Sequence, residues 1–205
     1  MIDRIQWLGH AGFRIQGPPL IYINPWRIAR NVFHADAILV TNDEYDHCSP
    51  ADIAKLRGPD TVVVASPAAA ACMDGAMVLR PWQSMNVGPA RITAVPAYTF
   101  TNHHPVSKGG LGFVISLDYY DVYYAGITDF VPELENIRAD VAILPVAAGQ
   151  GAMDQDRLVE LVRVLQPTWV IPSHWGTNGG TRHDVHALSR MLQDGAEVVM
   201  FEEMR

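Results

Sequence analysis

The sequence is poor in cysteine, in basic residues and in long apolar runs, and each shortage excludes a class of protein. With only two cysteines among 205 residues, a disulfide-stapled secreted scaffold is not expected. The 15 lysines and arginines are outnumbered by 22 aspartates and glutamates, which argues against nucleic-acid binding. No apolar run approaches the ~20 residues of a membrane-spanning helix, and the first residues lack a charged-then-apolar leader. We therefore expect a cytoplasmic protein whose partner is a small molecule, with no membrane and no nucleic acid.

The chain does have enough apolar residues for one substantial core. They make up 49% of the sequence, which is typical of a globular domain and not of a disordered segment. No internal repeat, low-complexity stretch or linker divides the chain, so we expect a single domain over residues 1–205.

Short β-rich runs dominate the first part of the chain, and strands alternate with helices in the last third. The expected strands are 4–8, 12–16, 20–24, 37–41, 61–65, 76–79, 90–95, 113–117, 122–125, 141–144, 169–171 and 197–201. The expected helices are 50–56, 68–73, 154–165 and 183–193. This pattern indicates sheet layers covered by helices, an α/β or α+β domain.

The most informative stretch is residues 41–48, Thr-Asn-Asp-Glu-Tyr-Asp-His-Cys, between an apolar strand and a helix start. It places Asn42, Glu44, Asp46 and His47 on a strand-to-helix loop, where a rigid scaffold often holds functional residues. A carboxylate next to an imidazole is typical of a site for Zn, Mn or Fe. An Asx-turn or capping role for Asp46 is the alternative.

Three further segments carry ligand-type side chains just after expected strands. They are Asn102-His103-His104-Pro105, Tyr124-Ala125-Gly126-Ile127-Thr128-Asp129 and Ile171-Pro172-Ser173-His174-Trp175-Gly176. Each has an ordinary explanation when taken alone. Asp129 would organise the helix start at 132–136, and a histidine that follows a strand is often hydrogen-bonded in a core or on a surface. His10, between two glycines, is most simply a turn residue.

Taken together and in order, these segments resemble the metallo-β-lactamase superfamily, most closely its small-hydrolase branch of the L-ascorbate-6-phosphate lactonase type. The matching segments are residues 7–13, 23–26, 35–41, 95–98, 110–115, 124–129, 141–146 and 171–176. The resemblance implies a four-layer αββα sandwich with a metal site at one edge between two sheets. It also makes a homo-oligomer an expectation by analogy with related small hydrolases.

The family's first loop reads Thr-His-x-His-x-Asp-His, and here Asn42 and Glu44 replace its first two histidines. Asp46 and His47 match the rest of that motif. The family's final histidine is present as His174, while Ile127 stands where its bridging aspartate would be. The resemblance therefore implies one metal ion in place of two.

The resemblance implies Asp46, His47 and His174 as ligands of that single ion. Glu44 and His104 are further candidate ligands, and His103 is an alternative to His104. Zinc is the expected ion, with manganese or iron as alternatives.

Three functions remain open on the sequence. The first is a hydrolase of a small ester, lactone or phosphoester with one metal ion, in which Glu44 or Asp129 activates water and His104 assists the leaving group. The second is an inactive relative that binds no metal and recognises a ligand or partner. The third is a metal-free acid–base enzyme that uses Glu44, Asp46 and His47. The candidate residues of the substrate pocket are Asn42, His103, Tyr124, Ile127 and Trp175.

Overall fold

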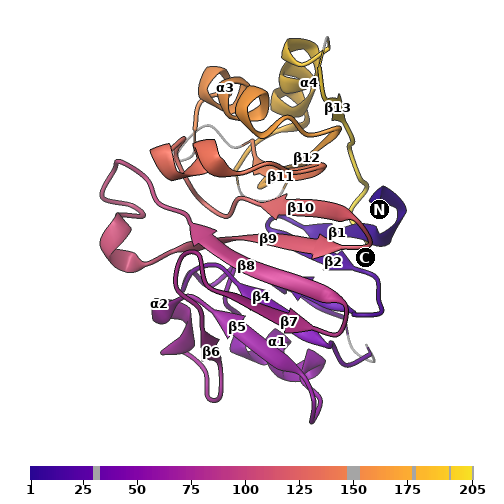
Figure 1. Cartoon of the computed structure of the whole chain (residues 1–205), viewed down its shortest axis with the longest axis vertical. Coiled ribbons are helices and arrows are strands. Elements are labelled where there is room, and N and C mark those ends of the chain that lie inside the picture. Colours follow the sequence, from indigo (N-terminus) through magenta and orange to yellow (C-terminus); the bar gives the residue numbers. More distant parts are fainter. Residues whose placement is uncertain (30–32, 147–152, 177–178, 194, 205) are drawn as a thin grey trace.

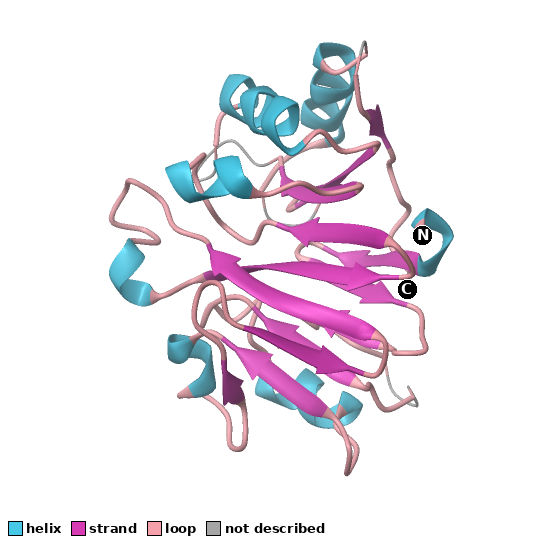
Figure 2. Cartoon of the chain, viewed as in Figure 1, coloured by secondary structure: helices cyan, strands magenta, loops and turns pink. Residues whose placement is uncertain are grey.

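The computed structural model describes residues 1–29, 33–146, 153–176, 179–193 and 195–204, which form two β-sheets that face each other (Figure 1). Helices lie against the outer faces of the sheets and not between them (Figure 2). This is the four-layer αββα sandwich that the sequence predicts. In the ranges described, no helix has the length and apolar character needed to cross a bilayer.

The first sheet has six strands that neighbour one another in chain order. They are β1 (Ile5–Gly9), β2 (Gly12–Ile15), β3 (Ile21–Ile23), β4 (Ala37–Val40), β5 (Val62–Ala65) and β6 (Met77–Val78). The first three pair antiparallel, and β3 to β6 pair parallel. Parallel neighbours need a crossover, and α1 (Pro50–Leu56) and α2 (Pro67–Ala70) supply those after β4 and β5.

The second sheet has seven strands in the order β13-β12-β11-β10-β9-β8-β7. They are β7 (Ser84–Val87), β8 (Ala90–Pro96), β9 (Leu111–Leu117), β10 (Tyr120–Tyr124), β11 (Val141–Pro145), β12 (Trp169–Ser173) and β13 (Glu197–Val198). Strands β7 to β10 are antiparallel and β10 to β13 are parallel. The parallel crossovers carry η3 (Pro132–Asn136), α3 (Gln155–Leu165) and α4 (Arg182–Met191). Two further short helices are η1 (Ile2–Arg4) and η2 (Val106–Lys108).

Strand β4 is buried on both faces, which explains why its sequence is apolar without alternation. Leu39 belongs to the core between the two sheets. Ile38 and Val40 belong to a second core, which includes Ile53 and Leu56 of α1. The loop that follows β4 therefore starts from a strand held on both sides.

The sequence predicts most elements to within a few residues, and helix 50–56 is confirmed with the same bounds. The final strand is shorter than predicted, since it ends at Val198 and not at 201. Strand β7 was not predicted because its sequence, Ser-Met-Asn-Val, lies at a sheet edge with little burial.

Asp52, in the first turn of α1, fixes the segment that follows β3. Its carboxylate accepts hydrogen bonds from the backbone N–H groups of Arg27 (2.8 Å) and Ile28 (3.1 Å). It also accepts from Lys55 Nζ (2.7 Å) and Ser49 Oγ (2.9 Å). Burial raises the pKa of Asp52, but the hydrogen bonds from Lys55, Ser49 and Arg27 outweigh it and hold that pKa below its ordinary value.

We expect Asp52→Asn to lower the free energy of unfolding at neutral pH by about 1–3 kcal/mol, because it removes the charge from a buried, four-fold hydrogen-bonded acceptor. Since the folded-state pKa is lowered, the stabilisation is present above the ordinary aspartate pKa. It is lost as the pH falls below about 4. Denaturant unfolding at several pH values measures both effects. Asp60→Asn, at an exposed position, is the matched control, and an equal loss in both variants would contradict the prediction.

Candidate metal centre

Histidines from both sheets meet at one edge of the sandwich. His10 occupies the turn between β1 and β2, Asp46 and His47 lie on the loop after β4, and His174 directly follows β12. The backbone N–H of His174 donates to the carbonyl of His10 (2.9 Å), which joins the two sheets at this edge. His10 and His174 both have a positive φ, at 48° and 59°, a conformation that non-glycine residues adopt at some energetic cost.

Three buried imidazoles converge, and two of them, those of His10 and His47, contact the Asp46 carboxylate. One nitrogen of each of His10, His47 and His174 lies within 4.8 Å of the others. Asp46 Oδ2 is 3.1 Å from His10 Nε2, and Asp46 Oδ1 is 2.8 Å from His47 Nδ1. On its other side, His47 Nε2 is 2.9 Å from His174 Nε2. His174 is held in turn by Ser173, whose Oγ is 2.9 Å from its Nδ1.

The electrostatics of this cluster favour an ionised Asp46 carboxylate beside the neutral imidazoles of His47 and His174. Burial raises the pKa of Asp46, but hydrogen bonds from His10 and His47 outweigh it and hold that pKa far below its usual range. Burial lowers the pKa of His47, which its contact with Asp46 offsets only in part. Burial, followed by the neighbouring His47 and His10, lowers the pKa of His174 well below its ordinary value.

This donor set fits a divalent metal ion. His10 Nδ1 is buried and has no hydrogen-bond partner among the described residues. At most one proton can lie between His47 Nε2 and His174 Nε2, so at least one of these two nitrogens presents a lone pair to the other. Buried lone pairs next to a buried negative charge call for a cation, and imidazole and carboxylate ligands suit zinc, iron or manganese.

A second group of side chains lies beside the first and shares Glu44 with it. Glu44 Oε1 is 3.2 Å from His104 Nε2 and 3.7 Å from His103 Nε2. A Glu44 carboxylate oxygen also lies within 4.8 Å of ligand atoms of Asp46 and His47. The contact with His104, against the effect of burial, lowers the pKa of Glu44. Glu44 is therefore an ionised carboxylate between the buried His104 and the three-histidine cluster.

Two of the predicted pocket residues shape the loops around the cluster. Asn42 is buried, and its Oδ1 accepts the backbone N–H of Glu44 (2.9 Å), so it forms the turn that presents Glu44. Tyr124 is fully buried, and its hydroxyl donates to the carbonyl of Ala11 (2.8 Å) and accepts from Asn24 Nδ2 (3.0 Å). Both side chains use their polar atoms within the protein.

The three remaining predicted site residues lie outside the groups of potential metal ligands among the described residues. Asp129 Oδ2 accepts the backbone N–H of Phe100 (2.6 Å), which ties the loop after β10 to the loop after β8. Trp175 is buried and stacks on Trp7 with ring centroids 4.6 Å apart, so it is part of the core. Ile127 is half-buried in the loop after β10. Neither Asp129 nor Trp175 joins a potential metal-binding group among the described residues.

Sequence reasoning favoured a turn role for His10, and the structure shows that the residue does more. Its backbone does form the turn, with the positive φ given above, but its side chain points into the cluster and contacts Asp46. The available signal was its position directly after a strand, the same position that His174 occupies after β12.

Comparisons with known proteins place the chain in a family. A model described as the β-lactamase superfamily domain matches residues 4–174. A UPF0173 metal-dependent hydrolase from Pyrococcus abyssi is 30% identical over 221 aligned positions, which cover 97% of this chain and 96% of that protein.

Solved structures agree with this placement. The crystal structure of a protein classed as a metal-dependent hydrolase, from Parabacteroides distasonis, superposes with a TM-score of 0.87 at 25% identity and covers 98% of this chain and 93% of its own. Igni18, a metallo hydrolase from Ignicoccus hospitalis, superposes with a TM-score of 0.79 at 20% identity over 98% of this chain and 95% of its own, which shows the shared fold. None of these descriptions mentions a lactone, so the lactonase-type branch stays a prediction. The chain belongs to the metallo-β-lactamase superfamily.

Proposed function

We propose that the protein is a hydrolase that uses one divalent metal ion, held by His10, His47 and His174 with Asp46. The observation that carries this proposal is the meeting of three buried imidazoles, two of which contact one buried, ionised carboxylate. The names of relatives such as the Pyrococcus abyssi protein, a metal-dependent hydrolase, support it. Zinc is the expected ion.

When bound, the ion would lower the pKa of a water molecule and polarise the oxygen of an ester, lactone or phosphoester. The residues around it have separable tasks. Asp46 accepts from both His10 and His47 and so fixes which nitrogen of each ring carries the proton. Ser173 orients His174 in the same way. The histidine rings are therefore oriented before any ligand binds.

Glu44 is placed to take a proton from the attacking water. It is ionised, it is about 29% exposed, and it lies beside the cluster. His104, 3.2 Å away on the other side of this carboxylate, is buried and can donate to a leaving group or a developing oxyanion. Asp129 is less suited to act as the base because its carboxylate already accepts the backbone N–H of Phe100.

The two other functions named from the sequence have less support. A relative that binds no metal would not need buried, unpaired imidazole nitrogens, yet this edge holds three buried histidines, two of them in contact with Asp46. A metal-free acid–base enzyme would use Asp46 as a proton acceptor, but a carboxyl whose pKa lies so far below its usual range is a poor base.

We expect purified protein to bind about one divalent ion per chain, and His174→Ala to abolish this binding, because the variant loses a ligand that is buried at the centre of the cluster. His10→Ala should weaken binding by about 10- to 100-fold or more, whether the imidazole is a ligand or orients one. Metal analysis and calorimetric titration with zinc give the stoichiometry and the affinity. Thermal unfolding with and without zinc provides a second readout.

His186→Ala, an exposed histidine on α4, is the matched control and should bind metal like the wild type. The proposal fails if the wild-type protein binds no zinc, manganese or iron and gains no thermal stability from them. Two ions per chain would contradict the single-metal part alone.

We expect Glu44→Gln to keep the metal content while lowering hydrolysis by about 100-fold or more, because the amide cannot accept the proton. Activity is measured on p-nitrophenyl acetate, dihydrocoumarin and bis-p-nitrophenyl phosphate, which represent esters, lactones and phosphoesters. Glu135→Gln, at an exposed position, is the control. Loss of the metal in Glu44→Gln would instead make Glu44 a ligand.

A further inference from the structure

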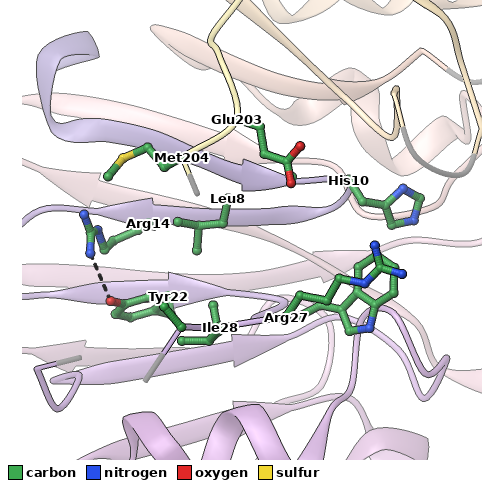
Figure 3. Close-up of a pocket in the computed structure, with 11 residues that line it drawn as sticks. Leu8, His10, Arg14, Tyr22, Arg27, Ile28, Glu203 and Met204 are labelled. Atoms are coloured by element: carbon green, nitrogen blue, oxygen red, sulfur yellow. Dashed lines mark hydrogen bonds between the residues drawn. The ribbon is translucent and has the colours of Figure 1, made fainter. Parts of the chain in front are cut away.

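A pocket of about 590 Å³ lies beside the metal centre and shares His10 with it. Its walls are formed by β1 and β2, the segment after β3 and the end of the chain near Glu203 and Met204 (Figure 3). The volume is within the range of small-molecule sites. Because His10 lines the pocket and also contacts Asp46, a molecule bound here has one end next to the candidate metal centre.

The pocket carries more positive than negative charge, although the protein as a whole has a net charge of −7. Two guanidinium groups, those of Arg14 and Arg27, line it, while Glu203 is the one carboxylate among the lining residues that the structure describes. Neither arginine forms an ion pair with any carboxylate of the described residues. Uncompensated guanidinium groups in a concave site attract an anion.

Arg27 is fixed in place without using the hydrogen-bond donors of its guanidinium group. Its backbone N–H donates to Asp52, and its φ of 57° sets the chain direction there. Its guanidinium lies over the Trp26 ring, 4.1 Å from the ring centroid. This cation–π contact leaves the N–H groups free, since none of them bonds to another described residue. Arg27 and Trp26 together offer a charge and an aromatic surface next to His10.

Arg14 lies at the opposite end of the pocket from Arg27 (Figure 3). Its Nε donates to Gln6 Oε1 (2.7 Å), and its Nη1 donates to the Tyr22 hydroxyl (3.2 Å). These neutral partners orient the guanidinium but leave its charge uncompensated. Arg14 therefore supplies a second, more distant positive charge.

We infer that this pocket binds an anionic small molecule, a carboxylate or phosphate, with Arg27 as its principal charge contact and Trp26 as the surface for its apolar part. This inference rests on the proposed function for its chemical consequence: the substrate of the hydrolase carries an acidic group. In this arrangement the acidic group of the substrate contacts Arg27. The bond to be cleaved then lies beyond His10, at the metal centre.

The binding step is tested in chelator-treated protein, so that no metal can serve as the ligand of the anion. The probes are benzoate, phenyl phosphate and the uncharged benzamide, each titrated calorimetrically. We expect saturable binding of an anion at least about tenfold tighter than that of benzamide, because charge-assisted hydrogen bonds to Arg27 form only with the anion. The relative affinities of benzoate and phenyl phosphate show which acid the pocket prefers.

Arg27→Gln should weaken anion binding by about tenfold or more, while Arg163→Gln, an exposed arginine on α3, should leave it unchanged. Equal binding of benzoate, phenyl phosphate and benzamide by the wild type would overturn the inference. So would unchanged anion binding in Arg27→Gln, given a wild-type unfolding temperature for that variant. Because no metal is present, this result is independent of whether the protein proves to be a metal-dependent hydrolase.

The consequence for substrates is tested in the metal-loaded protein with two esters of matched length, mono-p-nitrophenyl succinate and p-nitrophenyl butyrate. We expect kcat/KM to favour the acidic ester, Arg27→Gln to remove this preference and Arg163→Gln to keep it. Equal rates on both esters with wild-type protein would contradict an acidic substrate even if benzoate binds.

Discussion

The candidate centre depends on the Asp46 carboxylate, which is shared between two imidazoles. It contacts His10 from the β1–β2 turn and His47 from its own loop, so one buried charge holds two separate segments at the sheet edge. These contacts keep Asp46 ionised despite its burial. They also turn the far side of His47 toward His174 from the other sheet. A buried carboxylate beside neutral imidazoles is energetically unfavourable unless a cation compensates its charge. This is the physical reason to regard this edge as a metal centre.

The fold was largely readable from the sequence because its strands are buried and its helices have caps. Strand β4 and helix α1 were predicted from an apolar run and a Ser-Pro start, and the structure confirms both, with Ser49 accepting the backbone N–H of Asp52. Where burial is slight, the signal disappears: β7 is held by pairing with β8 and not by apolar side chains. Backbone pairing does not require apolar side chains, so a strand held in this way shows no hydrophobic pattern in the sequence.

The site was only partly readable, for a related reason. Loop motifs singled out Asp46, His47 and His174, and the structure brings the three together. His10 was assigned to a turn because a single histidine between glycines carries no local sign of a partner 36 positions away. Asn42 and Glu44 both replace histidines of the family's first-loop motif, but their side chains have different roles in the structure. The Asn42 amide shapes the turn, and the Glu44 carboxylate remains available beside His104.

The pocket and the centre are linked through residues that also stabilise the fold. Asp52 holds the backbone of Arg27 from α1, and Arg27 in turn lies on Trp26 beside His10. His10 contacts Asp46 through its side chain and His174 through its backbone. The superfamily fold supplies the edge where these strands end, but it does not determine which molecule binds there. If that selectivity comes from charges at single positions, as we propose for Arg27, two proteins with this same sandwich will differ in substrate when the residue at the position of Arg27 differs.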